Sequence, residues 1–543
     1  MLEGVRTLAD LIDRAAQEWP DKEAIIFKDQ RIIYREVQYK ANRLGQGFLK
    51  IGIKKGDKIA IWLSNIPEFV YTEFAVFKIG ATMVPLNTRF KAPEMEYILK
   101  QSDSTTLVML DNFLGLDFIE MIREVCPEIS HCRPGELKSE RLPLLKNVIC
   151  VSKKKYDGMF NYDEILGWES DPQVEDEIKR TQASVEPDDI ANTPYTSGTT
   201  GFPKGVMTTH HQYVRQVQDT GERVGIKEGD RINGGPPFCF NFGNILGPLM
   251  CFMFGGTLIP LEYWDPEEAL RLIQDEKCTH FTGAPTMYTM MMGRPGFGKY
   301  DLSSLRTGLI SAAPAPVQLI KDSLEKMGFE NLTSGYGMTE NSGATSLTVY
   351  GDPPEIVSTT VGKPLPDVEV KVVDPNTGKD LPPGEQGELC TRGYIIMKGY
   401  YKMPEETAET TDKDGWFHTK DLVTIDEDGY IKITGRLKDM FISGGTNVYP
   451  VEVENFLFTH PKVSQVSVVG VPDERMGEVG MAFIIPKEGE SSTAEEIIEY
   501  CKGKIANYKI PKYVEFVKEF PLNPMGKIMK FKLQDLGKEI IKS

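Results

Sequence analysis

The segment from Tyr195 to Val206 carries the clearest chemical signal in the sequence. It reads YTSGTTGFPKGV, a row of hydroxyl and glycine residues followed by Lys204. Glycines let backbone N–H groups approach phosphate oxygens, hydroxyls donate further hydrogen bonds, and lysine supplies positive charge. The segment is not a Walker A loop, because Pro203 stands where the second glycine of that motif would be. A Ser/Gly linker is the alternative, but linkers rarely contain Phe-Pro-Lys. We expect a phosphate-binding loop.

A second segment, SGYGMTE, ends at Glu340. Gly335 and Gly337 leave space around Tyr336, whose ring could stack on a base. Thr339 can donate a hydrogen bond to a phosphate, and the carboxylate of Glu340 can hold Mg²⁺. Taken alone the segment is weak evidence, because Gly-Tyr-Gly is common in turns.

Two further motifs are also weak in isolation. Asp421 lies in GWFHTKDL and Arg436 in YIKITGRLKD. A carboxylate suits the two hydroxyls of a ribose, and a guanidinium suits a ribose or phosphate oxygen. A β-hairpin with a surface salt bridge would explain the same pair. Near the C-terminus, NPMGKIMK would present Lys527 on a loop tip, although most such lysines are ordinary surface residues.

Together, in this order and spacing, the four motifs resemble the adenylate-forming superfamily of acyl-CoA synthetases, adenylation domains and firefly luciferase. The resemblance extends from Leu8 to about Leu533. It implies that a carboxylic acid is activated with ATP to an acyl-adenylate, with release of pyrophosphate, and that the acyl group then passes to a thiol, usually that of coenzyme A. The substrate carboxylate is the nucleophile, so catalysis would be positioning and charge stabilisation.

The resemblance also implies roles for single residues. The β- and γ-phosphates of ATP would be held by Thr196, Ser197, Gly198, Thr199, Thr200, Gly201 and Lys204. The adenine would lie among Ala312, Ala313, Pro314, Gly335 and Tyr336, and Gly337 is a further expected nucleotide-binding residue. Asp421 and Arg436 would hold the ribose. Thr339 would contact the α-phosphate, Glu340 would bind Mg²⁺, and Lys527 would bridge the reacting carboxylate and the α-phosphate.

In this superfamily the small C-terminal domain swings between two poses, and the matching pivot here is Lys438. One pose would insert Lys527. The other would insert the loop SGGTN beside a tunnel for the pantetheine of CoA. Gly444 and Gly445 suit that place, because only a bare backbone fits next to a narrow thiol channel.

The acyl pocket departs from the pattern of many relatives. The run PFCFNFG places Phe240 where those relatives have a His, and Met338, Gly343 and Ala344 resemble positions that face the pocket. An apolar wall favours an apolar acid over acetate. We therefore expect an acyl-CoA ligase for a medium- to long-chain fatty acid. An aryl or alicyclic carboxylate–CoA ligase and an adenylating enzyme that loads a carrier protein stay open. A luciferase-like oxygenase and a non-enzymatic nucleotide-binding module are disfavoured.

Composition narrows the partners. The net charge of −17 argues against general nucleic-acid binding, which relies on a broad basic surface. Eight cysteines without a C-x-x-C pair are typical of free thiols in a reducing cytosol. Cys126, His131 and Cys132 lie close together, but a zinc site there is disfavoured for want of a second ligand pair. We expect a cytoplasmic enzyme whose partners are small molecules; a homodimer stays open.

The elements that position these motifs follow an α/β pattern. Helical spacing of Leu8, Leu11, Ile12 and Ala15, a strand from residue 58 to 63 and a helix from 69 to 77 indicate layered helices and strands. Residues 127–148 look like a surface excursion. The uncharged run from 232 to 261 holds six Gly, four Pro and three Asn, too many breakers for a membrane helix. It is interpreted as loop, strand and pocket wall.

Three more patterns divide the rest of the chain. Asp265-Pro266 opens a helix, residues 355–435 alternate like a compact β subdomain, and a capping box at Thr493 precedes a helix. We expect an α/β fold. A large N-terminal AMP-binding domain over residues 1–435 would hold two α/β sheets layered with helices, plus the β subdomain. A small mobile α+β domain would cover residues 436–543.

Overall fold

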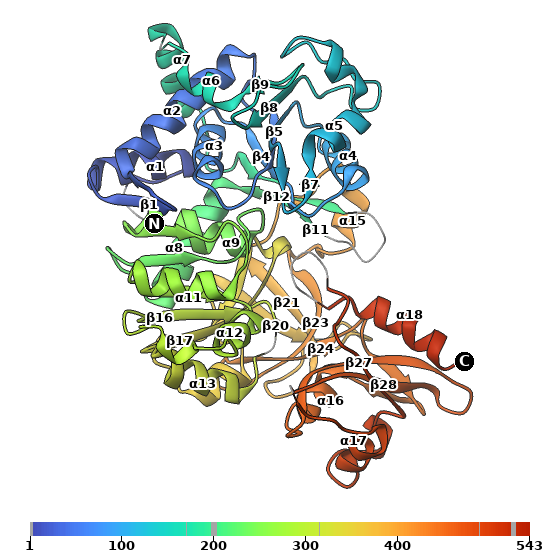
Figure 1. Cartoon of the computed structure of the whole chain (residues 1–543). Coiled ribbons are helices and arrows are strands. Elements are labelled where there is room, and N and C mark those ends of the chain that lie inside the picture. Colours follow the sequence, from blue (N-terminus) through green and yellow to red (C-terminus); the bar gives the residue numbers. More distant parts are fainter. Residues whose placement is uncertain are drawn as a thin grey trace.

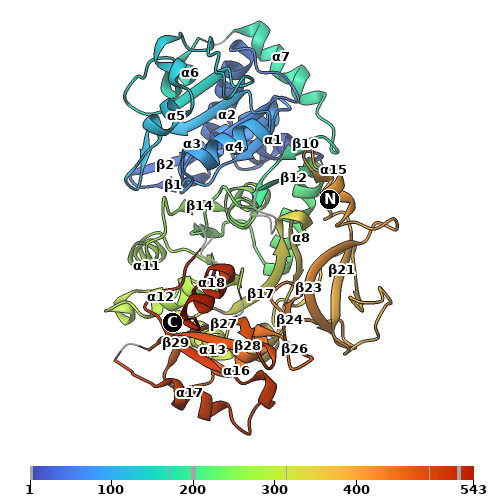
Figure 2. The same ribbon diagram turned by 90° about the vertical axis from the view of Figure 1, so that its right-hand side faces the viewer.

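The computed structural model of the protein describes residues 4–169, 171–196, 203–313, 315–487, 489–522 and 528–542. Two nine-stranded sheets, a four-stranded sheet and a five-stranded sheet organise these residues. Figure 1 and Figure 2 both show the first α/β unit, blue to cyan, at one end of the molecule and the C-terminal unit, orange to red, at the other. The expected α/β class is confirmed.

The first nine-stranded sheet is mainly parallel and has the order β11-β12-β10-β4-β3-β5-β8-β9, with β22 paired to β12. Its strands are β3 (Lys58–Trp62), β4 (Thr82–Pro85), β5 (Thr106–Leu110), β8 (Asn147–Val151), β9 (Phe160–Asn161), β10 (Ile190–Asn192), β11 (Tyr195–Thr196), β12 (Lys204–Thr209) and β22 (Gly399–Tyr400). The helices around it are α2 (Tyr34–Lys50), α3 (Pro67–Lys78), α4 (Ala92–Gln101), α5 (Phe118–Val125), α6 (Tyr162–Gly167) and α7 (Pro172–Ala183). A two-stranded ribbon, β6 (Asn112–Phe113) and β7 (Leu116–Asp117), precedes α5.

The second nine-stranded sheet has the order β19-β18-β17-β16-β15-β13-β14-β1-β2 and is parallel from β17 to β1. Its strands are β1 (Glu23–Phe27), β2 (Gln30–Ile33), β13 (Arg231–Gly234), β14 (Thr257–Pro260), β15 (His280–Gly283), β16 (Thr307–Ser311), β17 (Asn331–Met338), β18 (Gly343–Leu347) and β19 (Lys363–Pro364). The helices connected to it are α8 (His210–Val224), α9 (Asn241–Asn244), α10 (Met250–Phe254), α11 (Pro266–Asp275), α12 (Pro285–Met292), α13 (Val317–Met327) and α14 (Pro354–Thr359).

The largest core lies where these two units meet. Helix α1 (Leu8–Glu18) begins with a capping box at Thr7, which supplies its first N–H groups with partners, and it buries the predicted apolar face. Trp62 and Phe118 stack with ring centroids 3.9 Å apart inside this core. Because apolar side chains of both units belong to the one core, the two sheets are fixed relative to each other.

The β subdomain is an antiparallel sheet of β20 (Val368–Val373), β21 (Gly387–Gly393), β23 (Phe417–Ile425) and β24 (Ile431–Arg436). The predicted turn after β20 is present, and the N–H of Gly378 donates to the carbonyl of Asp374 at 2.8 Å. Helix α15 (Pro404–Ala408) lies between β22 and β23 in the chain. The expected β subdomain is confirmed.

The C-terminal unit is a sheet of β25 (Phe441–Ser443), β26 (Thr446–Val448), β27 (Val463–Asp473), β28 (Gly477–Pro486) and β29 (Tyr513–Phe516). Alternate residues of β27 and β28 face two separate cores. Helices α16 (Pro450–Leu457) and α17 (Ala494–Cys501) contribute to one core, and α18 (Lys530–Ile540) contributes to the other.

Several local expectations need adjustment. The run from 232 to 261 contains α9, a π-helix at Ile245–Leu249 and α10 in addition to the strands and loops that were expected. Residues 127–148 include a 3₁₀ turn and bury Ile129, Leu142 and Leu145, so this excursion is anchored to the core. At α17, Thr493 caps the helix, while the side chain of Glu496 binds Lys462 and Ser492. No helix in the described part of the chain is long and apolar enough to cross a membrane.

Candidate active site

The predicted adenine loop lies at the ends of two parallel strands. Ser311 ends β16 beside Gly335 of β17, and its hydroxyl donates to the Gly335 carbonyl at 2.7 Å. Ala312 and Ala313 follow directly and are exposed. Ala312 has φ of 73°, a left-handed conformation that is uncommon for a residue with a side chain. The carboxyl ends of parallel strands are the usual ligand-binding edge of such sheets.

Close packing between strands explains why residues 335 and 337 are glycines, and the sequence alone did not indicate this. A Cβ atom on Gly335 would lie 2.2 Å from Leu347 Cδ2, and one on Gly337 would lie 2.1 Å from the carbonyl oxygen of Gly343. Both contacts are with the antiparallel neighbour β18. The two glycines therefore let β17 and β18 approach closely. This role is separate from the expected one of leaving space for a base beside Tyr336.

Tyr336, Asp421 and Arg436 form one connected group. The Tyr336 hydroxyl donates to Asp421 Oδ2 at 2.5 Å, and Arg436 Nε lies 2.5 Å from Asp421 Oδ1. Asp421 is buried, with a side chain 3% exposed. Burial opposes the charge of Arg436, but the Asp421 carboxylate outweighs it and raises the pKa of the guanidinium. Burial, and then the Asp421 charge, raise the pKa of Tyr336, so the phenol stays protonated.

A second group joins the phosphate-loop strand to Glu340. Tyr400 of β22 pairs with Val206 of β12, and its hydroxyl donates to Glu340 Oε1 at 2.9 Å. The Lys204 ammonium lies 5.0 Å from the centroid of the Tyr400 ring, a cation–π distance. Thr339 and Glu340 begin a 3₁₀ turn directly after β17. The structure thus brings together Lys204 and Glu340, which are distant in sequence, and adds Tyr400, which no local motif had indicated.

The phosphate loop is described only at its ends. Thr196 of β11 pairs with Lys204 of β12 in an antiparallel ladder. The hydroxyl of Tyr97 donates to the carbonyl of Pro203 at 3.0 Å. Seven predicted site residues lie outside the described residues: Ser197, Gly198, Thr199, Thr200, Gly201, Pro314 and Lys527.

The residues predicted to face the acyl pocket lie beside the apolar side chain of Ile245 and the polar side chain of Gln216. Phe240 is half-buried and precedes α9, and Met338 pairs with Gly343 across β17 and β18. A Cβ atom on Gly343 would lie 2.9 Å from Ile245 Cδ1 of the π-helix. The amide of Gln216 is bonded to Ala344 in both directions, at 2.7 and 3.1 Å. Gln216 is a polar contact that the sequence did not reveal.

A buried polar network lies under α9. Asn244 Nδ2 donates to Glu73 Oε1 at 2.7 Å, and the Tyr213 hydroxyl bonds to Asn241 at 2.5 Å and to Asn192 at 2.7 Å. Glu73 is fully buried, and burial raises the pKa of its carboxyl to about 8, against the opposing effect of the Asn244 hydrogen bond. Glu73 is therefore neutral at pH 7.

The segment that contains the predicted pivot joins the β subdomain to the C-terminal sheet. Lys438 is exposed in a turn in which the N–H of Asp439 donates to the Arg436 carbonyl at 3.1 Å. Gly444 and Gly445 form the tip of the β25–β26 hairpin, with φ of 57° and 80°. Positive φ at both central residues is the signature of a type I′ turn, which requires Gly or Asn. These glycines therefore have a local backbone role.

Comparison with known proteins places the chain in a family. The family model of the AMP-binding enzymes matches residues 12–401, and that of the AMP-binding enzyme C-terminal domain matches residues 452–527. The protein YngI of Bacillus subtilis (strain 168) is 42% identical over 533 residues, which cover 97% of this chain and 96% of YngI. The medium-chain acyl-CoA ligase ACSF2, mitochondrial, of Danio rerio is 39% identical over 97% of this chain and 88% of its own length.

A solved structure extends this similarity to the fold. The anthranilate CoA ligase AuaEII, in complex with anthranoyl-AMP, superimposes with a TM-score of 0.86 at 28% identity, covering 99% of this chain and 98% of AuaEII. The family models, the near full-length relatives and this structure agree. The chain therefore belongs to the AMP-binding enzyme family and is an AMP-forming acyl-CoA ligase.

Proposed function

We propose that the protein converts a medium- to long-chain fatty acid, ATP and CoA to acyl-CoA, AMP and pyrophosphate through an acyl-adenylate. The assignment of adenylate chemistry is supported mainly by one observation: motifs that are far apart in the sequence lie close together in the fold. Tyr336 contacts Asp421, and Tyr400 links Glu340 to the strand that carries Lys204. Groups suited to a base, a ribose and phosphates thus meet around the end of β17.

The mechanism follows from what these groups can bind. Asp421 would accept hydrogen bonds from the ribose hydroxyls, and Tyr336 would cover one face of the adenine. Lys204 and the loop before it would hold the β- and γ-phosphates. The fatty-acid carboxylate would attack the α-phosphorus, and pyrophosphate would leave. Thr339 and Lys527 would stabilise the charge that develops on the α-phosphate, with no covalent enzyme intermediate.

The residues present fit a Mg²⁺ ion. Glu340 offers a half-buried carboxylate, and oxygen ligands are those that Mg²⁺ prefers. Glu340 would hold the ion, which would neutralise charge on the ATP phosphates. Tyr400, by donating to one oxygen of that carboxylate, would fix its orientation.

The fatty-acid assignment rests on relatives and on the pocket wall. ACSF2 proteins of Danio rerio and Homo sapiens, both named medium-chain acyl-CoA ligases, are 39% and 37% identical to this chain. Phe240 adds an aromatic, half-buried side chain beside α9. An aryl carboxylate is the second candidate, because AuaEII, an anthranilate CoA ligase, has a TM-score of 0.86.

The two-pose cycle is part of the same proposal. The mobile domain would begin after Gly435 and rotate about Lys438, which is exposed. Rotation would exchange Lys527 for the hairpin tip at Gly444 and Gly445, which would then line the CoA channel. A cytoplasmic location and a homodimer remain predictions.

The test is pyrophosphate release from the purified full chain across fatty acids of increasing length, benzoate, anthranilate and a cyclohexane carboxylate. Each acid is measured with CoA and with a phosphopantetheinyl carrier protein in its place. We expect kcat/KM to peak at a medium or long chain and thioester formation to need CoA. A peak at an aromatic acid would favour the second candidate. Turnover with the carrier alone would overturn the CoA assignment.

Phe240→Ala refines the same measurement. If Phe240 lines the acyl site, removing its ring should shift kcat/KM ratios toward bulkier acids, since that ratio measures discrimination. Phe242→Ala is a matched control, because Phe242 packs against the main core. We expect that control to lower the melting temperature while leaving the ratios unchanged. If kcat/KM of Phe240→Ala fell by the same factor for all acids, Phe240 would be a core residue and not part of the acyl site.

A further inference from the structure

Three potential metal ligands lie together on one face of the β subdomain. Glu388 and Cys390 lie on β21, and His418 is opposite Cys390 on the neighbouring strand β23. The opposite face of the same sheet buries Leu389 and Val423 in an apolar cluster. Among the residues that the structure describes, this is the one group of at least three His, Cys, Asp or Glu side chains compact enough to hold an ion.

The distances fit a small tetrahedral ion. His418 Nδ1 lies 3.0 Å from Glu388 Oε2 and 3.5 Å from Cys390 Sγ, and all three ligand atoms lie within 4.8 Å of one another. Zinc bonds to nitrogen, oxygen and sulfur of about 2.0–2.3 Å put neighbouring ligand atoms about 3.3–3.7 Å apart. Only small side-chain movements would therefore place the three atoms around one ion.

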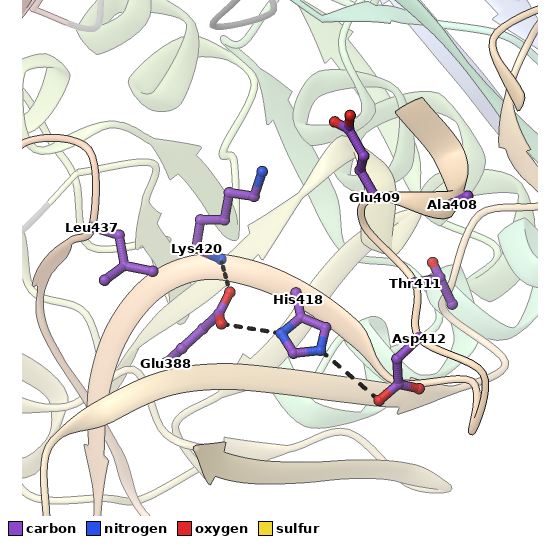
Figure 3. Close-up of a pocket in the computed structure, with 8 residues that line it drawn as sticks. All are labelled: Glu388, Ala408, Glu409, Thr411, Asp412, His418, Lys420 and Leu437. Carbon is purple, nitrogen blue, oxygen red and sulfur yellow. Dashed lines mark hydrogen bonds and ion pairs between the residues drawn. The ribbon is translucent and has the colours of Figure 1, made fainter. Parts of the chain in front are cut away.

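A carboxylate lies on each side of the His418 ring. Asp412 Oδ2 lies 3.9 Å from His418 Nε2, on the far side of the ring from Glu388 (Figure 3). A proton on Nε2 would face that carboxylate and leave Nδ1 free to coordinate. Glu388 Oε1 accepts the backbone N–H of Lys420 at 2.9 Å, which leaves Oε2 directed toward His418. The 3.9 Å separation is longer than a hydrogen bond, so a rotation of the Asp412 side chain would be needed to form the carboxylate–histidine hydrogen bond that recurs around zinc ligands.

A pocket of about 340 Å³ opens beside the group. Its lining includes Glu388, Asp412, His418, Lys420 and Leu437, and Figure 3 shows His418 between the two carboxylates. Glu388 and His418 line this pocket, whereas Cys390 is buried behind them, so an ion and a water molecule as fourth ligand would enter from the Glu388–His418 side. None of the three ligands belongs to the predicted ATP-binding set.

We propose that Glu388, Cys390 and His418 form a binding site for Zn²⁺, with water from the pocket as the fourth ligand and Asp412 orienting the imidazole. A thiolate, an imidazole and a carboxylate are ligands that Zn²⁺ takes in proteins. Binding releases the thiol proton of Cys390 to solvent.

The site has a structural consequence for the hinge. Lys420 lies two positions after His418 on β23, and its carbonyl accepts the N–H of Leu437 at 3.0 Å. Leu437 directly precedes the predicted pivot Lys438. An ion at His418 would therefore tie β23 to β21 at the point where the linker to the C-terminal unit is attached. It would act on the geometry of the linker without contacting ATP.

The experiment uses the purified full chain after treatment with a chelator and its removal. Bound Zn²⁺ is counted by elemental analysis, and affinity is measured by competition with a chromophoric chelator. Co²⁺ serves as a spectroscopic probe, because a thiolate ligand gives an intense near-ultraviolet charge-transfer band. We expect one equivalent of Zn²⁺ and that band in the Co²⁺ form. Failure to bind a stoichiometric equivalent would overturn the proposal.

Variants assign the ligands. Cys390→Ser should abolish the charge-transfer band and weaken Zn²⁺ binding at least about 100-fold, and Asp412→Asn should weaken it about 10–100-fold. Cys501→Ser, at a buried free thiol of the C-terminal unit, is the matched control and should retain both signals. His418 is 31% exposed, so His418→Gln should fold and lose binding even if Cys390→Ser does not fold. A band that persists in Cys390→Ser, or Zn²⁺ binding that persists in folded His418→Gln, would contradict the assignment.

Discussion

Asp421 and Arg436 face each other across β23 and β24, with a guanidinium nitrogen 2.5 Å from a carboxylate oxygen. The other Asp421 oxygen accepts the Tyr336 hydroxyl at 2.5 Å. Both oxygens that would bind a ribose are therefore already engaged by protein groups. The ribose hydroxyls of ATP would have to replace or share these bonds. Because Tyr336 and Arg436 hold the Asp421 carboxylate in one position, that carboxylate is a pre-organised hydrogen-bond acceptor.

Replacing Asp421 by Asn tests this arrangement. The change keeps the size of the side chain but removes the charge, and we expect kcat/KM for ATP to fall by about 10²-fold. Tyr336→Phe, the matched variant, removes one hydroxyl and keeps the ring that would cover adenine, so its loss should stay below about tenfold. Pyrophosphate release at varied ATP measures both. Equal losses in the two variants would argue that the tyrosine hydroxyl, and not the carboxylate, binds the ribose.

Glu340→Gln tests the metal assignment. The carboxylate would hold Mg²⁺, and the amide keeps the shape without the charge. We expect the Mg²⁺ concentration for half-maximal rate to rise about tenfold or more, with partial recovery at high Mg²⁺. Tyr400→Phe removes the hydroxyl that donates to Glu340 at 2.9 Å and should produce a smaller shift in the same direction. An unchanged Mg²⁺ dependence in Glu340→Gln would mean that other groups hold the ion.

Lys527→Ala separates the two half-reactions. This lysine lies outside the described residues, and its role follows from the resemblance. We expect adenylation to fall about 10²–10³-fold, because one charge contact of the transition state is lost. Thioester formation from supplied acyl-adenylate and CoA should be retained. Lys532→Ala, at an exposed lysine of α18, controls for the loss of positive charge nearby. A similar fall in both half-reactions would remove Lys527 from the adenylation step.

Gly445→Asn tests the CoA channel without straining the hairpin. Gly445 has φ of 80°, and a Cβ atom there would meet no atom within 4 Å, so the observed pose has room for a side chain. Asn tolerates the left-handed region that Leu would not. We expect pyrophosphate release to persist and thioester formation from acyl-adenylate to fall about 10–100-fold, because the side chain would obstruct the second pose. Gly503→Asn is the matched control, since Gly503 also has positive φ and open space. Normal thioester formation in Gly445→Asn would mean that CoA does not pass this hairpin.

Glu73 predicts a pH dependence of stability. Its carboxyl pKa is about 8 in the folded protein and near 4.5 when exposed. Below pH 4.5 the Glu73 carboxyl is protonated in both the folded and the unfolded protein, and its contribution to the free energy of unfolding is fully present. As the pH rises toward 8 the unfolded chain ionises while the folded site stays neutral, so stability is lost, by an amount on the order of a few kcal/mol.

Glu73→Gln should remove this contribution, because the amide stays neutral and can still bind Asn244. We expect the melting temperature of the parent protein to fall more steeply than that of the variant between pH 5 and 8. Glu177→Gln, at an exposed carboxylate of α7, should follow the parent curve. Parallel curves for parent and Glu73→Gln would show that Glu73 is not neutral in the fold.

The sequence predicted the elements that local chemistry controls. The apolar spacing of α1, the Asp265 cap that accepts two N–H bonds at the start of α11, and the turn after β20 each depend on residues a few positions apart. The family was also recognisable, because its four motifs lie in order along the chain. The π-helix after Phe240 was missed, since tertiary packing, and not a local pattern, imposes it.

Only the tertiary structure decided which residues meet. Tyr336 and Asp421 are separated by 85 positions, and Glu340 and Tyr400 by 60, yet each pair shares a hydrogen bond. Strand pairing creates both contacts, and no spacing in the sequence encodes it. The same is true of the close approach that requires Gly335 and Gly337 and of the group at His418. The sequence by itself determined the chemistry available to this ligase; the fold determined its geometry, because partners drawn from distant strands come together only when the sheets assemble.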